Sequence, residues 1–232
     1  MRSPFELSGP NQPPRAGGKP RHLVVLLHGY GSDGNDLIGL APHWAEVLPD
    51  TEFLSPHAPF PCEMGPFGRQ WFSFEDRTPE AILAGTKAAA NILDAFLDGA
   101  LAARGLTDRD LALVGFSQGT MMALYVALRR PQAVAAVVGY SGALVGAETL
   151  AAEIRARPPV LLVHGDADTM VPVSELARAS AALKEAGVPV TVELRPGLPH
   201  SIDERGLTLG GRFIARAFAG QSTAGETAAK AK

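Results

Sequence analysis

The sequence is short of cysteine, of long apolar runs and of positive charge. Its single cysteine, Cys62, excludes an internal disulfide and is typical of a reducing, cytoplasmic setting. Its longest apolar stretches, such as 23–27, are too short to span a bilayer, and no apolar core of signal-peptide length follows Arg2. A formal net charge of -3 provides no basic surface for a phosphate backbone. We therefore expect a soluble cytoplasmic protein with no transmembrane segment and no nucleic-acid partner.

What the sequence does have is an alternation of β-rich and helical stretches. The 232 residues are 46% apolar, which is enough for one α/β domain with a continuous core. Several runs are apolar without interruption, as in parallel strands that helices cover on both faces. We therefore predict a mostly parallel, doubly wound sheet of about six to seven strands, with reactive side chains at the carboxyl ends of the strands. The predicted strands are 23–29, 51–56, 111–116, 136–142, 160–165 and 190–196, and the predicted helices are 34–48, 79–103, 118–130, 147–156, 173–187 and 201–219.

The two ends of the chain differ in composition from the rest. Residues 1–20 are rich in Pro and Gly, so we expect an extended N-terminal arm with a short edge strand near residues 5–7. Residues 220–232 have few apolar side chains to bury and are predicted to form a flexible tail. Between them, residues 21–219 should form a single domain.

The stretch 115–119, GFSQG, places Ser117 between two glycines. The bare Gly-x-Ser-x-Gly pattern is weak, because glycine-rich chains contain it by chance. Its context is more specific, since the apolar run LALV precedes it and a helical stretch follows it, which is the strand-turn-helix setting of a nucleophile elbow. Glycine at 115 and 119 suits so sharp a turn, where a Cβ would clash. Ser117 is therefore a candidate nucleophile, and an ordinary helix N-cap is the alternative.

A serine nucleophile needs a base, and the base needs an acid that orients it. His200 lies in a Gly/Pro loop between a predicted strand and a predicted helix, which makes it the best-placed base. Asp166 and Asp168 follow the predicted strand at 160–165, and their spacing does not separate them. The chain order Ser, Asp, His after successive strands is that of an α/β hydrolase. Of the other histidines, His28 and His164 are interpreted as structural, and His22, His43 and His57 are assigned no chemistry.

The tetrahedral intermediate of acyl transfer needs two N–H donors for its oxyanion. One is expected from Gln118, directly after the nucleophile, and the other from the loop after an early strand. In the stretch 26–36, LLHGYGSDGND, Gly29 and Gly31 allow the backbone to turn back toward the serine and to point the Tyr30 N–H into the site. A phosphate-binding loop is the alternative, but the stretch has neither Gly-Lys-Ser/Thr nor Gly-x-Gly-x-x-Gly.

Five ordered blocks resemble the phospholipase/carboxylesterase family, which includes bacterial carboxylesterases and the acyl-protein thioesterases. They are LLHGYGSDGNDL, GRQWFSF, GFSQGTMMAL, HGDADTMVPV and GLPHSID, and the similarity spans about residues 21–215. The resemblance implies an α/β-hydrolase fold with no large lid domain, a carboxylesterase activity and no cofactor, and we assign no metal ligand. It also assigns the acid to Asp168 rather than Asp166, and the oxyanion donors to Tyr30 and Gln118.

The stretch 59–74, PFPCEMGPFGRQWFSF, is aromatic and rich in Pro and Gly, so we expect it to overlie the site. Its side chains, with others beside the acid and the base, are candidates for an acyl groove, and packing in the core is the alternative for each. Cys62 has no evident base and is interpreted as uninvolved. Arg69 either organises the loop or meets a substrate head group. The candidate groove residues are Phe67, Trp71, Phe72, Met170, Val171 and Leu198.

These observations predict a serine hydrolase that cleaves esters of small to medium acyl groups through an acyl-enzyme. A thioesterase or a lysophospholipase is a second enzymatic interpretation. A hydrolase-fold binding protein without turnover is a third, although every group that catalysis requires is present. The expected partner is a small-molecule ester or thioester. Some relatives form oligomers. A homodimer that buries part of the aromatic loop is therefore an open alternative to a monomer.

Overall fold

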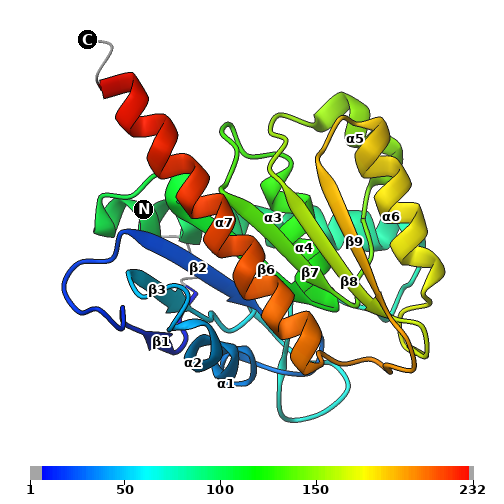
Figure 1. The fold of residues 1–232 in the computed structure, drawn as a ribbon. Helices are drawn as coiled ribbons and strands as arrows, with labels where there is room; N and C mark the ends of the chain where they lie inside the picture. Colours follow the sequence, from blue (N-terminus) through cyan, green and yellow to red (C-terminus); the bar gives the residue numbers. More distant parts are fainter. Residues whose placement is uncertain (1–6, 230–232) are drawn as a thin grey trace.

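A seven-stranded sheet forms the centre of the computed structural model, which describes residues 7–229 and the side chains of residues 7–220 (Figure 1). The strands lie in the order β1-β3-β2-β6-β7-β8-β9, and every neighbouring pair is parallel except β1 with β3. The strands of this sheet are β1 (Asn11–Gln12), β2 (His22–Leu27), β3 (Thr51–Leu54), β6 (Leu111–Phe116), β7 (Ala136–Tyr140), β8 (Val160–Gly165) and β9 (Val190–Arg195).

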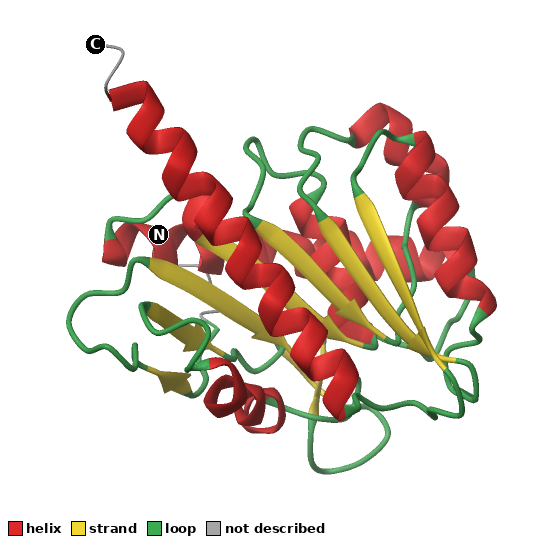
Figure 2. Cartoon of the chain, in the orientation of Figure 1, coloured by secondary structure: helices red, strands yellow, loops and turns green. Residues whose placement is uncertain are grey.

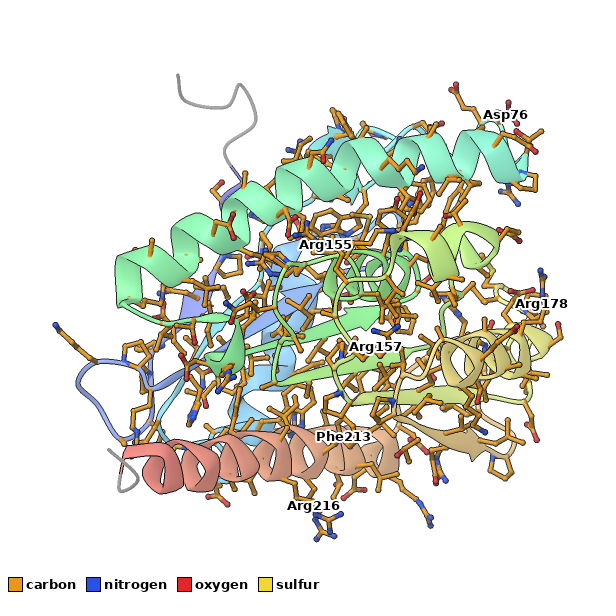
Figure 3. All side chains as sticks on the ribbon, turned by 90° about the horizontal axis from the view of Figure 1, so that it is seen from above. Asp76, Arg155, Arg157, Arg178, Phe213 and Arg216 are labelled. Atoms are coloured by element: carbon orange, nitrogen blue, oxygen red, sulfur yellow. The ribbon has the colours of Figure 1, made fainter. Side chains whose placement is uncertain are left out.

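Helices cover both faces of the sheet (Figure 2). Along β2, Leu23, Val25 and Leu27 belong to one buried cluster, and Val24 and Leu26 belong to the other. Side chains of α3, α4 and α6 pack in the first cluster, and those of α1, α2 and α7 pack in the second; Figure 3 shows α3 and α7 on opposite sides of the sheet. The helices are α1 (Gly34–Leu37), α2 (Ala41–Trp44), α3 (Pro79–Arg104), α4 (Gln118–Ala127), α5 (Ala147–Glu153), α6 (Ser174–Glu185) and α7 (Glu204–Ala229).

The predicted α/β fold is confirmed, with differences near the N-terminus. All six predicted strands are present, and the seventh is β1, which lies later than the edge strand expected near residues 5–7. Residue 7 is not in a strand, and residues 5 and 6 lie outside the described residues. The helix predicted over 34–48 is instead two short α-helices joined by a 3-10 turn at Ile38–Leu40. Gly39 and Pro42 explain the break, since neither residue favours a helix interior.

The C-terminal helix is longer than the sequence predicts. α7 runs from Glu204 to Ala229, ten residues beyond the expected end at 219, so the backbone of 220–229 is helical where a flexible tail was expected. Alanine, the strongest helix former, recurs in this stretch and favours continuation of the helix. Residues 230–232 lie outside the described part of the chain. Among residues 7–229, no helix combines the length and hydrophobicity that crossing a membrane requires.

An ion-pair cluster anchors the far end of α4. Arg130 follows this helix, and its side chain is only 3% exposed. Its guanidinium group binds carboxylates of Asp94 and Asp98 on α3 and of Asp108 beyond it. Because a buried guanidinium is stable only when it is paired, these contacts hold the end of α4 against α3. The N-terminal end of α4, which begins at Gln118, therefore belongs to a helix whose other end is fixed to α3.

Candidate active site

Ser117 occupies a sharp turn between β6 and α4. Its φ of 54° and ψ of -116° are unusual for a residue other than glycine. A Cβ at Gly115 would overlap the backbone of Gly119, and a Cβ at Gly119 would overlap Leu27 O, both well inside the 3.0 Å limit of real contacts. The Ser117 side chain makes no capping hydrogen bond at the start of α4, so it is not an ordinary N-cap. The turn has the geometry of a nucleophile elbow.

The carboxylate of Asp168 pairs with the imidazole of His200. Asp168 Oδ2 lies 2.7 Å from His200 Nδ1, and its Oδ1 accepts the N–H groups of Met170 (2.8 Å) and Val171 (2.9 Å). Burial works to raise the pKa of Asp168, but these hydrogen bonds outweigh it and lower the pKa. A carboxylate only accepts, so His200 donates from Nδ1 and its Nε2 is left as the basic nitrogen.

The imidazole of His200 lies next to the elbow. Its ring centroid is 4.7 Å from that of Phe116, the residue before Ser117. His200 is partly buried, with 19% of its side chain exposed, so it contacts the protein on one side and solvent on the other. The structure thus brings the candidate base from the loop after β9 to the end of β6.

The structure distinguishes the two aspartates that spacing left open. Asp166 Oδ1 accepts the N–H of Gly197 at 2.6 Å and so braces the loop that carries His200. His164 is buried, as expected for a structural histidine, and its Nε2 lies 2.9 Å from Val171 O and 3.3 Å from Asp168 Oδ2. Asp166 therefore holds the loop, and Asp168 contacts the base.

The loop after β2 passes against the elbow. A Cβ at Gly29 would lie 3.2 Å from the ring of Phe116 and 3.4 Å from Ser117 Cβ. Gly31 has a φ of 81°, and its N–H donates to Arg69 O at 2.9 Å. Glycine at both positions therefore lets this loop approach Ser117 and turn away from it.

His28 fixes the peptide between Gly29 and Tyr30. Its Nε2 accepts the N–H of Ala58 at 2.9 Å, so its Nδ1 carries the proton and donates to Gly29 O at 2.8 Å. Burial lowers the pKa of His28, which keeps the ring neutral. In a trans peptide the N–H points away from the carbonyl, so holding Gly29 O also sets the direction of the Tyr30 N–H.

Gln118 joins the elbow to the aromatic segment. Its Oε1 accepts the N–H of Trp71 and its Nε2 donates to Phe72 O, both at 2.8 Å. The indole Nε1 of Trp71 donates to His28 O at 3.0 Å. The loop that carries Tyr30 and the first residue of α4, Gln118, are therefore both hydrogen-bonded to the same segment.

The aromatic stretch provides fewer contact residues than the sequence suggests. Trp71 is 0% exposed and Phe72 is 2% exposed, and their hydrogen bonds and packing account for the burial. Neither side chain is accessible in the structure, so we do not include them in the proposed acyl surface. Phe67 and Met170 are exposed, and Val171 is buried.

The other residues considered for the groove and its loop also have defined places. Leu198 is half-buried, and its carbonyl accepts the N–H of Ala167. Arg69 donates to Ala58 O and Pro59 O, so it organises the loop. Cys62 is buried.

One residue that binds this segment was missed. Glu63 receives several hydrogen bonds, including one from the Tyr30 hydroxyl. A lone acidic residue in a Pro/Gly-rich loop gives no sequence signal for such a role, because most acidic residues are solvated.

A serine at a strand-turn-helix elbow, with an acid and an imidazole from two later strand ends, defines an α/β hydrolase. Comparison with known proteins leads to the same class. The Phospholipase/Carboxylesterase family profile matches residues 15–217, and the chain belongs to this family. The predicted family, the α/β-hydrolase fold and the carboxylesterase class are thereby confirmed.

Three known proteins illustrate the similarity. The crystal structure of esterase PE8 superposes with a TM-score of 0.87 at 45% identity, and the match covers 91% of this chain and 99% of that one. Esterase YpfH of Escherichia coli is 28% identical over 207 residues, which cover 88% of this chain and 83% of the relative. Acyl-protein thioesterase 1 of Gibberella zeae is 25% identical over 199 residues, covering 77% of this chain and 83% of the relative.

Proposed function

We propose that the protein cleaves carboxylic esters of small to medium acyl groups through a triad of Ser117, His200 and Asp168. The observation that carries the proposal is the 2.7 Å contact between His200 and Asp168, beside a serine elbow in the same structure. The names of the relatives, esterase PE8 and esterase YpfH, support ester substrates.

The reaction proceeds in two symmetric halves. His200 Nε2 takes the hydroxyl proton of Ser117 while Oγ forms a bond to the carbonyl carbon, and the carbonyl electron pair moves to oxygen. The N–H groups of Tyr30 and Gln118 stabilise this oxyanion. Return of the electron pair breaks the bond to the leaving alkoxide, which receives the proton from His200. Water then replaces the alcohol and repeats the sequence to release the acid, while Asp168 stabilises the charged imidazole in both halves.

The acyl chain lies against exposed apolar side chains beside the triad. Phe67 is 86% exposed and Met170 is 73% exposed, so both large apolar side chains are accessible to a ligand. Leu198, which is half-buried near the base, extends this surface, and Val171 is buried beside the acid. A surface this open suits short or medium chains, because it encloses little of the ligand.

A thioesterase is the second candidate, favoured by the similarity to acyl-protein thioesterase 1. The same triad would serve it, since only the leaving group differs. We propose a cytoplasmic setting for either activity, with a small molecule as the partner, because the chain has a single cysteine and no excess of basic residues.

A fluorophosphonate probe tests the chemistry directly. The wild type should be labelled with one equivalent at Ser117, and Ser117→Ala should not be labelled. A panel of p-nitrophenyl esters and acyl thioesters of increasing chain length then separates the two activities. Failure of the wild type to react with the probe, or labelling at another residue, would refute the proposed triad and favour a binding protein without turnover.

A further inference from the structure

The carboxylate of Glu63, outside the triad, collects four hydrogen bonds from three segments. Its Oε1 accepts the Tyr30 hydroxyl (2.8 Å) and the Phe74 N–H (2.7 Å). Its Oε2 accepts the Ser73 hydroxyl (2.6 Å) and the Gln70 side-chain amide (3.1 Å). The Glu63 N–H in turn donates to Gln70 Oε1 at 2.9 Å. A single exposed side chain therefore links the loop after β2, the hairpin formed by β4 and β5, and the loop that precedes α3.

The hairpin that carries Glu63 lies directly against the loop after β2. Its strands are β4 (Phe60–Pro61) and β5 (Arg69–Gln70), which pair antiparallel. Arg69 N–H donates to Ser32 O at 2.7 Å, and its carbonyl accepts the N–H of Gly31. Backbone bonds thus fix the loop after Tyr30, and Glu63 fixes the Tyr30 side chain.

Both partners keep their roles throughout the working pH range. Desolvation works to raise the pKa of Glu63, but the bonds from Ser73, Phe74, Gln70 and Tyr30 outweigh it and lower the pKa to about 2. Desolvation, followed by the contact with Glu63, raises the pKa of Tyr30, so its hydroxyl stays a donor. An ionised carboxylate whose oxygens already accept four donors is not suited to proton transfer.

The position of Tyr30 makes this link relevant to catalysis. Its ring lies between the Glu63 carboxylate at the hydroxyl and the Phe74 ring, whose centroid is 5.0 Å away. We propose that Glu63 is a positioning residue for ester hydrolysis, which holds the Tyr30 side chain and thereby keeps the Tyr30 main-chain N–H directed at the oxyanion. This inference rests on the proposed function, in which that N–H stabilises the tetrahedral intermediate.

The contacts argue against a role in general stability. Glu63 is exposed, and its four hydrogen-bond donors all lie in loops around the site or in the hairpin. Holding a long exposed side chain in one rotamer costs conformational entropy, and Glu63 adds no buried apolar side chain of its own in return. Orientation of the Tyr30 loop is the benefit that the geometry offers.

A double-mutant cycle tests the proposal with p-nitrophenyl acetate as substrate. We expect Glu63→Ala to lower kcat about tenfold with KM changed by less than about twofold, because deleting an oxyanion donor outright costs about 10²–10³ in kcat and loosening one costs less. Tyr30→Phe should lower kcat to a similar extent. Since Glu63→Ala already removes the hydrogen bond from the Tyr30 hydroxyl along with the other three, the additional loss of that hydroxyl should make the double variant no slower than Glu63→Ala. Glu75→Ala is the matched control, because Glu75 is also an exposed glutamate and directly follows the same segment. Its kcat and KM should equal those of the wild type.

The measurements separate positioning from unfolding and from failure of the triad. Rates are expressed per active site titrated with the fluorophosphonate, at a temperature well below each melting transition. The decrease in kcat should be the same from pH 6 to pH 9, since Glu63 does not titrate there. Multiplicative effects of the two substitutions, or an unchanged kcat in Glu63→Ala, would overturn the inference while the labelled wild type still upheld the triad. An unlabelled wild type would instead mean that the proposed function had failed.

Discussion

Substitution of Gly119 by alanine should disrupt both the fold and the catalytic turn. A Cβ at this position overlaps Leu27 O and C, so the backbones of α4 and β2 would have to separate by at least an ångström. β2 cannot yield easily, because it is bonded to β3 on one side and β6 on the other. Overpacking of this kind costs about 1–3 kcal/mol, or more where the backbone must move. Alanine gains back up to about 1 kcal/mol of helix propensity. Because the backbone must move, the cost should reach the upper end of that range, and we expect a net loss of about 2 kcal/mol.

Gly99→Ala provides the matched control. Gly99 lies in α3, and a Cβ there would have no heavy atom within 4 Å. The same chemical change should therefore stabilise the protein by up to about 1 kcal/mol. Urea unfolding followed by far-UV circular dichroism gives both free energies, and ester hydrolysis gives the activity of the folded fraction. If Gly119→Ala unfolded within about 0.5 kcal/mol of the wild type and kept its activity, the steric account of the elbow would be wrong.

Two further predictions concern the acid and the buried histidine. Asp168→Asn should lower kcat about 10³–10⁴-fold, because the amide no longer holds the base in its productive tautomer. Asp166→Asn keeps an acceptor for Gly197 N–H and should lower kcat by less than about tenfold. Steady-state kinetics on the two variants measure both effects. For His28, burial holds the folded pKa below 6.5, so stability is present above pH 6.5 and falls as the unfolded state takes up the proton below it. The urea midpoint of the wild type should decrease from pH 7 to pH 5 more than that of His28→Asn, and equal decreases would count against this account.

The central sheet and the elbow could be predicted because their signals are local. An uninterrupted apolar run needs cover on both faces wherever it occurs, and the strands that contain 23–27, 111–114 and 160–163 are buried accordingly. The glycines at 115 and 119 predict that backbone segments approach each other closely there. In the structure, the backbone at Gly115 lies against that of Gly119, and Gly119 lies against the backbone of Leu27. In both cases a residue and its neighbours in sequence carry enough information.

Other features depend on contacts between distant segments. Nothing in the spacing separates Asp166 from Asp168, since either could reach a histidine more than thirty residues away. Their roles diverge only where the loop after β9 meets the loop after β8. Trp71 reads as a groove residue because it is aromatic and lies in a loop, yet its indole N–H finds His28 O, 43 residues earlier, and the ring is buried. Glu63 is recognisable only from partners that the fold assembles.

The main chain of Ser117 has a consequence for how this protein tolerates change. A residue with a side chain held at a φ of 54° and a ψ of -116° gives up about 1–3 kcal/mol relative to one that adopts the conformation freely. The free energy of unfolding of a globular domain is about 5–15 kcal/mol. The strain at this one residue is therefore a sizeable fraction of the total stability. A sequence optimised for durability alone would place glycine there and would have no hydroxyl to react. The proposed nucleophile thus lies at a point where the backbone conformation lowers the stability of the fold.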